Sequence, residues 1–372
     1  MANMTTFLRR LMLILLLPMG MSTAVMAWDK PANFLFTSQR GGQTISVIDV
    51  SKDSFVGDIV TAYPIDDIAV SSFGDYAFAS HAEAQKITVI NLHTRRIERV
   101  VTVSIKPRHL TFEQNYGLVM TDSINGGMAM LDTQGKLEVF VNPTIPPSKD
   151  IIFGPTGIVA YYHAGPEGLI GAVAMNSGRP LWQTKVPVSN ENIPLVRSLD
   201  GLFIVFVLPE KGQAHALMAA DGKLIGSQQL GKGLSRPYVT ANGQYFLIAE
   251  QANQQVHVLS QSNFNKITSF ATSEPSTLVT AGLFDIMAVA YADKRLFAMD
   301  LLKFDGQATH SLPIKGQASD VIVTSDSKHA YAAVPSANAI AHLNLRSGKL
   351  SYIEGIDQPD IVTMGASNAV CH

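Results

Sequence analysis

Short apolar stretches alternate with polar turns along almost the whole chain, without long amphipathic helical segments between them. Within the stretches, apolar and polar positions alternate with a period of two, as in residues 45–48 and 87–90. This alternation is typical of β-strands. Turn signals recur at spacings of 40 to 44 residues, at Asn33, Asp75, Asn115, Thr156, Asp200, Asn242, Asp285 and Ser327. The pattern predicts an all-β chain built from a repeat of about forty residues.

Each repeat has room for four short strands, which is the make-up of a β-propeller blade. We find eight candidate second strands and eight candidate fourth strands, so we predict an eight-bladed propeller. Seven blades is the alternative, because the middle repeats are degenerate. The first repeat lacks its innermost strand, and the last apolar segment covers residues 361–364. We therefore expect the C-terminal strand to complete the blade begun at Asn33, which removes exposed sheet edges.

The first 27 residues have the pattern of an export signal. Arg9 and Arg10 precede an apolar run, residues 11–17, and small residues follow up to Ala27. This run is too short to span a membrane, and the order of segments is that of a cleavable signal peptide. We expect a signal peptide at residues 1–27, a propeller domain at 28–366 and a C-terminal tail at 367–372. The expected location is a bacterial periplasm, with no membrane span after signal removal.

Composition narrows the possible functions. Of 372 residues, 47% are hydrophobic and 16% are charged, so the chain can bury a large core. The formal net charge of −2 argues against a nucleic-acid partner. Cys371 is the single cysteine of the sequence, which excludes an intramolecular disulfide and a thiolate-rich metal cluster.

Two segments resemble a known repeat. Residues 41–59 (GGQTISVIDVSKDSFVGDI) and 84–101 (AQKITVINLHTRRIERVV) are similar to the YVTN-type propeller repeat. That group is related to the propeller of cytochrome d1 nitrite reductases and of haem d1 biosynthesis proteins. The resemblance implies a periplasmic propeller rather than a particular activity, because one fold hosts many functions.

The sequence lacks the common catalytic signatures. It contains no C-x-x-C-H, G-x-S-x-G, H-E-x-x-H, Walker A or dinucleotide-binding glycine motif. A serine-hydrolase triad stays open, because its members are dispersed along a chain. The histidines His93, His215, His257, His310, His329 and His342 are expected in turns and strands with packing or solvent-facing roles.

Polar residues precede the predicted innermost strands and should ring one mouth of the central channel. These positions include Asp67, His109, Asp150, Asp320 and Asp360. Loops between the second and third strands of each blade open on the same face and contribute His81, Asp122 and His163. Imidazole and carboxylate groups are ligands of zinc and other divalent metals. The pattern thus predicts a site for zinc or copper formed by His81, His109, Asp122, His163, Asp67 and Asp150.

Two other interpretations of this face remain. The aspartates can be structural, since Asp at a strand start accepts backbone N–H bonds. The basic residues Arg108, Lys149 and Arg236 can instead bind an anionic ligand, such as a cofactor with carboxylates. At the tail, Cys371 and His372 could bind a soft metal, or form a redox-reactive or frayed end.

Our first functional hypothesis is an exported, non-catalytic propeller that binds a metal, a cofactor or a protein partner at the channel face. Its role would be accessory to a periplasmic metal-handling or redox system. The second hypothesis is an enzyme (a lyase, hydrolase or oxidoreductase) with His109 or His163 as acid–base. The third is a pure protein-interaction scaffold.

Overall fold

The computed structural model describes residues 34–72, 74–113, 117–142, 144–148, 151–164, 168–186, 193–282 and 286–364. The chain divides into two units, Met1–Lys30 and Pro31–His372, and all described residues belong to the second. The expected signal peptide (1–27) and tail (367–372) lie outside the described residues, so both remain predictions.

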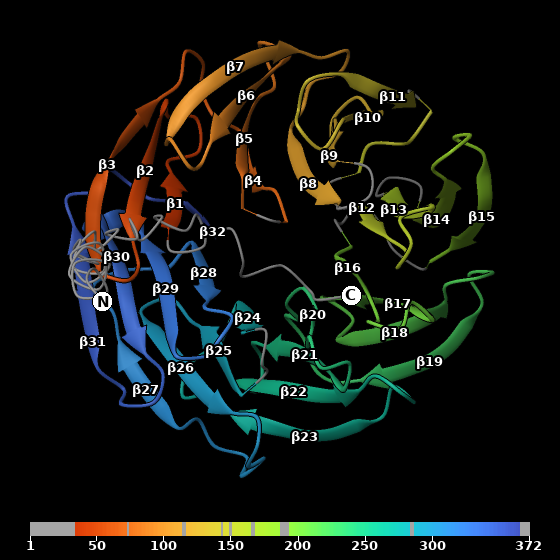
Figure 1. Ribbon diagram of the computed structural model, residues 1–372. Helices are drawn as coiled ribbons and strands as arrows, with labels where there is room; N and C mark the ends of the chain where they lie inside the picture. Colours follow the sequence, from red (N-terminus) through yellow and green to blue (C-terminus); the bar gives the residue numbers. More distant parts are fainter. Residues whose placement is uncertain are drawn as a thin grey trace, which may run out of the picture. The chain divides into compact units, whose positions relative to one another are not determined.

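The second unit is an eight-bladed β-propeller. Eight four-stranded antiparallel sheets surround a central axis (Figure 1). The predicted fold and blade number are confirmed, and the seven-bladed alternative is wrong. Antiparallel strands joined by short turns explain why forty residues suffice for one blade.

The blades are numbered here in chain order, with strands given from the axis outward. Blade 1 contains β32 (Ile361–Met364), β1 (Phe34–Ser38), β2 (Thr44–Asp49) and β3 (Ser54–Val60). Blade 2 contains β4 (Asp67–Val70), β5 (Tyr76–His81), β6 (Lys86–Asn91) and β7 (Arg96–Thr102). Blade 3 contains β8 (His109–Glu113), β9 (Gly117–Thr121), β10 (Met128–Leu131) and β11 (Glu138–Asn142). Blade 4 contains β12 (Ile151–Phe153), β13 (Val159–Ala164), β14 (Leu169–Ala174) and β15 (Pro180–Lys185).

The second half of the ring continues in the same order. Blade 5 contains β16 (Leu195–Arg197), β17 (Phe203–Leu208), β18 (Gln213–Met218) and β19 (Leu224–Gln229). Blade 6 contains β20 (Tyr238–Val239), β21 (Tyr245–Glu250), β22 (Gln255–Ser260) and β23 (Lys266–Ala271). Blade 7 contains β24 (Leu278–Ala281), β25 (Met287–Tyr291), β26 (Arg295–Asp300) and β27 (His310–Pro313). Blade 8 contains β28 (Asp320–Val323), β29 (His329–Val334), the 3₁₀ turn η2 (Pro335–Ala337), β30 (Ala339–Asn344) and β31 (Leu350–Glu354).

The ring closes through a strand from the far end of the chain, as predicted. Strand β32 pairs antiparallel with β1, from Leu35 opposite Met364 to Ser38 opposite Ile361. This pairing satisfies the backbone groups of β1 that would otherwise form an open sheet edge. Blade 1 is thus assembled from both ends of the propeller.

The core lies between blades rather than inside one central layer. Buried apolar side chains form eight clusters, and the one between blades 8 and 1 contains Leu35, Ile48 and Tyr331. Second strands such as β1 are buried along their whole length, because both of their faces contact neighbouring blades. In six blades the pairing of the third and fourth strands shifts register, which twists the outer strand away.

Candidate functional site

The innermost strands all begin at the same end of the channel, which we call the channel mouth. Equivalent backbone hydrogen bonds define equivalent positions in the blades: Asp66 N, Arg108 N, Ser319 N and Asp360 N each donate to the second strand of the same blade. Asp360 therefore aligns with Asp66 and Arg108, one residue earlier than the sequence pattern suggested. The next position is occupied by Asp67, His109, Asp320 and Ile361.

Asp67 and Asp320 connect innermost strands of neighbouring blades. Asp67 accepts from Ile68 N (2.9 Å) and from Leu110 N in the next blade (2.9 Å). Asp320 accepts from Val321 N (2.9 Å) and from Val362 N in blade 1 (3.1 Å). Burial raises the pKa of each carboxyl to about 6, although these backbone N–H groups favour the ionised form. These contacts are those of the structural interpretation, in which aspartates at strand starts accept backbone N–H bonds.

Several other charged side chains at the mouth form ion pairs with one another. Glu83 binds both Lys106 Nζ and Arg108 Nη2 at 2.6 Å, and these two cations lower its pKa. The Arg108 Nε atom also lies 3.4 Å from Asp122 Oδ1. In blade 1, Arg40 Nε lies 3.3 Å from Asp360 Oδ2. Arg108 is thus held by two carboxylates, which a bound anion would have to displace or share.

The polar residues at the ends of second strands are buried and hydrogen-bonded. His81 donates from Nδ1 to the Pro64 carbonyl (2.8 Å), so its Nε2 accepts from the Thr88 hydroxyl (2.7 Å). Burial lowers the pKa of His81 and keeps the ring neutral. Asp122 accepts from Ile124 N and from Asn125 N and Nδ2. Burial disfavours its ionised form, but these hydrogen bonds outweigh burial and lower its pKa.

His109 and His163 occupy different surroundings. His109 is half-buried, and its Nε2 lies 3.2 Å from the Ser123 hydroxyl. His163 is buried on β13, where its Nδ1 accepts from Ile193 N (3.1 Å). Each ring is therefore oriented by at least one protein partner.

Within the described ranges, no three His, Cys, Asp or Glu side chains are arranged to hold a metal ion. Lys149, Asp150, Cys371 and His372 lie outside the described residues. Arg236 is exposed beside the start of β20. A metal site that uses the undescribed residues stays a prediction.

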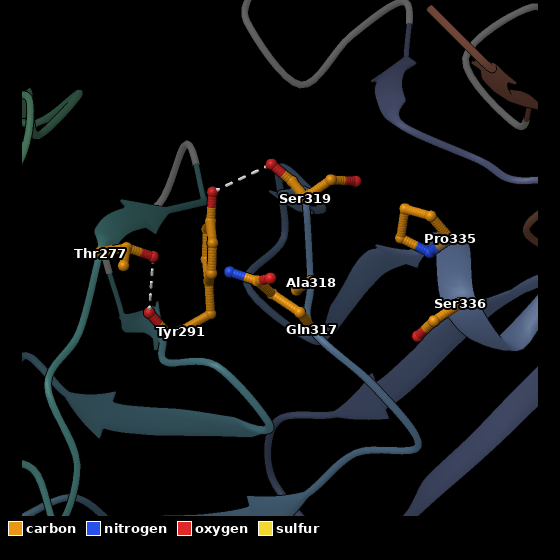
Figure 2. Close-up of a pocket in the computed structure, with 7 residues that line it drawn as sticks. All are labelled: Thr277, Tyr291, Gln317, Ala318, Ser319, Pro335 and Ser336. Atoms are coloured by element: carbon orange, nitrogen blue, oxygen red, sulfur yellow. Dashed lines mark hydrogen bonds between the residues drawn. The ribbon is translucent and has the colours of Figure 1, made fainter.

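A cavity of about 430 Å³ lies between blades 7 and 8 at the mouth. It is lined by Thr277, Tyr291, Gln317, Ala318, Ser319, Pro335 and Ser336. Figure 2 shows the Tyr291 ring as one wall, with the Gln317 amide pointing toward it. The Tyr291 hydroxyl donates to the Ser319 carbonyl (3.2 Å). Burial and then the charges of Asp320 and Asp360 raise the pKa of Tyr291, so the hydroxyl stays protonated.

A second cavity, of about 450 Å³, opens at the opposite end of blades 2 and 3. It is lined by Ser71, Asp75, Tyr76, Asn91, His93, Phe112, Thr133 and Gln134. His93 Nε2 pairs with Asp75 Oδ1 at its edge (2.8 Å). This cavity resembles the first in size and is well separated along the blades, which makes it a useful control.

Sequence reasoning missed a buried Ser–His–Glu arrangement in blade 6. The Ser269 hydroxyl lies 2.8 Å from His257 Nδ1, and His257 Nε2 lies 3.3 Å from Glu250 Oε2. Burial and then Lys266 lower the pKa of His257 to about 4, so the ring is a poor base near neutral pH. Glu250 also accepts two hydrogen bonds from Asn253 at the strand end. The arrangement therefore serves the packing of this blade.

Comparison with known proteins identifies the fold but no family. No family model and no curated protein matches the chain. Among solved structures, the chain is similar to dihydro-heme d1 dehydrogenase NirN in complex with DHE, with TM-score 0.73, 13% identity and coverage of 92% of this chain and 77% of that one. The designed protein Ika8 gives TM-score 0.64, 12% identity and coverage of 87% and 93%. Apo AztD from Citrobacter koseri gives TM-score 0.61, 15% identity and coverage of 88% and 96%. These likenesses confirm the β-propeller fold that the sequence resemblance implied.

Proposed function

We propose that this chain is an exported, non-catalytic propeller that binds a small ligand at the channel mouth. Its role is accessory to a periplasmic metal-handling or redox system. The arginine pair and apolar run before Ala27 support export. In the part of the chain that the structure describes, no helix is both long and apolar enough to cross a membrane.

The observation that carries this proposal is the cavity between blades 7 and 8. Its volume of about 430 Å³ lies within the usual range for small-molecule sites. It combines the aromatic wall of Tyr291 with the neutral polar groups of Thr277, Gln317 and Ser336. Such a lining suits a ligand with a flat, partly apolar body and hydrogen-bonding substituents. The structurally similar protein NirN was solved in complex with DHE, which supports ligand binding by a propeller of this kind.

The basic residues of the mouth extend the proposal to an anionic cofactor. Arg236 is exposed, and together with Arg108 and Lys149 it would meet carboxylate groups on the ligand. A divalent metal, zinc or copper, is the other ligand we propose for this face. At this face its binding would depend on Asp150; the tail residues Cys371 and His372 stay a separate predicted site for a soft metal, expected at the opposite mouth.

The test is native mass spectrometry and an absorption spectrum of protein purified from periplasm without a metal-affinity tag. A co-purifying organic ligand that is lost in Gln317→Ala, and kept in Gln134→Ala at the opposite cavity, supports the cofactor; a co-purifying metal that is lost in Asp150→Asn supports the metal. Loss of the co-purifying ligand in Gln134→Ala alone would instead assign the binding site to the cavity at the other end of the blades. A ligand-free mass in all samples favours a protein-interaction scaffold, and partner capture follows.

An enzyme remains the second candidate at the same mouth. The half-buried His109, with Ser123 at its Nε2, is the residue placed to move a proton there. If the protein turns over a ligand, His109→Gln should abolish turnover and leave the thermal unfolding midpoint unchanged. Full activity in that variant would exclude His109 as the acid–base.

A further inference from the structure

Four side chains form a hydrogen-bonded cluster where the last blade meets the first. Tyr331 and His329 lie on β29, His342 lies on β30, and Asp53 lies in the turn between β2 and β3 of blade 1. Figure 1 shows these strands side by side at the closure of the ring. Asp53 holds a left-handed backbone conformation with φ of 48°. Arg95 and Phe264 hold the same conformation in the equivalent turns of other blades, so Asp53 is presented by a turn that the propeller repeats.

Asp53 is bound by two donors of blade 8. Its Oδ1 accepts from the Tyr331 hydroxyl at 3.0 Å, and its Oδ2 lies 3.0 Å from His342 Nδ1. The Tyr331 ring stacks on the His342 ring, with centroids 4.7 Å apart and an interplanar angle of 11°. Because a carboxylate only accepts, His342 carries its proton on Nδ1, and its Nε2 presents a lone pair.

That lone pair faces His329. His342 Nε2 and His329 Nδ1 are 2.8 Å apart, so His329 donates from Nδ1. The ring centroids are 4.9 Å apart. This is close to the separation expected when both contacting nitrogens lie on the line that joins the two centroids. The two nitrogens thus face each other nearly head-on, which suits one shared proton. A metal ion needs both lone pairs to converge on a point beside the line that joins the nitrogens.

We propose that Asp53, Tyr331, His342 and His329 form an acid-sensitive latch between blade 1 and blade 8. One added proton fits without movement: His342 then donates from Nδ1 to Asp53 and from Nε2 to His329, whose own proton moves to Nε2. A second proton puts two N–H groups face to face at the 2.8 Å contact. The pair then separates, and Asp53 loses its hold on blade 8.

The charges around His342 act in both directions, and those that disfavour its protonation add to the effect of burial. Burial lowers the pKa of His342; Asp53 opposes this shift, while His329 and Lys349 add to it. Lys349 lies in the turn between β30 and β31 of the same blade. From the turn between β28 and β29, Asp326 is paired with Lys328. From blade 1, Asp49 is paired with Lys52. The folded protein binds protons less readily at His342 than the unfolded chain does. The contact between blades 1 and 8 therefore loses stability as pH falls below the ordinary histidine pKa.

Hydrogen-exchange mass spectrometry at pH 7, 6 and 5, corrected for intrinsic rates, tests the latch on the full chain. As pH falls, we expect amide exchange in β1–β2 and β29–β30 to rise about tenfold per pH unit over the range in which opening of the contact takes up the second proton. His329→Gln removes the ring that faces His342 Nε2 and should flatten this rise. His93→Gln is the matched control, because His93 also pairs with an aspartate, Asp75, but sits in blade 2; it should keep the rise.

Circular dichroism at pH 7 checks that His329→Gln folds. If that variant is unfolded, Asp53→Asn replaces it: removal of the anion should shift the onset of exchange to higher pH. The proposal is overturned by an acid response of equal size in His329→Gln and wild type. It is also overturned if exchange in acid rises equally in all blades, or if Asp53→Asn leaves the onset unchanged.

Discussion

Asp320 gives the sharpest test of the channel-mouth description, through the variant Asp320→Asn. The carboxyl has a folded-state pKa of about 6, raised by burial from an ordinary value of 3.8. The unfolded chain therefore releases this proton more easily, and the wild-type protein loses stability as pH rises from 4 to 6. Between pH 5 and pH 7 the loss amounts to no more than about 1.3 kcal/mol for this one group.

The substitution removes this pH dependence but also changes the hydrogen bonds. Asn accepts with one oxygen, whereas Asp320 accepts from Val321 N and Val362 N with two. The NH₂ group of the asparagine, itself a donor, would then face one of these two backbone N–H groups, at a cost of about 1–3 kcal/mol. At neutral pH that cost is of the same size as the relief from burying a charge. The absolute stability is therefore a poor readout, and its change with pH is the informative one.

The assay is urea unfolding of wild type and Asp320→Asn at pH 5, 6 and 7, followed by circular dichroism. From pH 5 to pH 7, the unfolding free energy of the wild type should fall by about 1.3 kcal/mol more than that of the variant. Asp132→Asn is the control, since Asp132 also accepts two backbone N–H groups but sits in an outer turn. An unchanged pH dependence in Asp320→Asn would refute the assignment of a buried, proton-binding carboxyl at this position.

Three further predictions concern the contact between blades 1 and 8, the packing at Gly231 and the closure of the ring by β32. Tyr331→Phe removes the hydroxyl donor to the Asp53 carboxyl group and should lower the unfolding free energy by about 1–3 kcal/mol, measured by urea unfolding; the loss should shrink in an Asp53→Asn background. Gly231→Ala places a methyl group against the buried Glu250 carboxylate and should cost about 1–3 kcal/mol, whereas Gly154→Ala finds ordinary contact distances and should be nearly neutral. Deletion of β32 should leave β1 unpaired and shift the protein to larger assemblies in size-exclusion chromatography, whereas deletion of only the residues beyond β32 should leave the elution volume of the full chain nearly unchanged.

The sequence was sufficient for the architecture because the repeat is a local signal. Turn residues every forty positions and alternating strands predicted eight blades, and the missing first strand predicted closure by β32. The structure also places the expected residues Asp67, Arg108 and His109 at one mouth. Their partners were not predictable, because the Pro64 carbonyl that binds His81 is backbone, and no sequence pattern specifies where a carbonyl points.

The cluster at the blade 8 joint was missed for a different reason. His215 and His257 are third residues of β18 and β22, whereas His342 is the fourth residue of β30. Side chains alternate between the faces of a strand, so this single step turns His342 toward blade 1. Its partner Asp53 is far away in sequence. Alignment of the repeats residue by residue would have shown the step, but not the partner.

The pairing of β1 with β32 also determines when the molecule can finish folding. Gln39 and Gln358, which meet beside this pairing, are 319 residues apart in the chain. Bringing such distant segments together costs about 5 kcal/mol of chain entropy if no intervening structure has formed. Formation of the intermediate blades brings these segments together before they pair. The first three strands to be synthesised must therefore wait for the last one, and until it arrives β1 presents an unpaired edge on which another chain could add a strand.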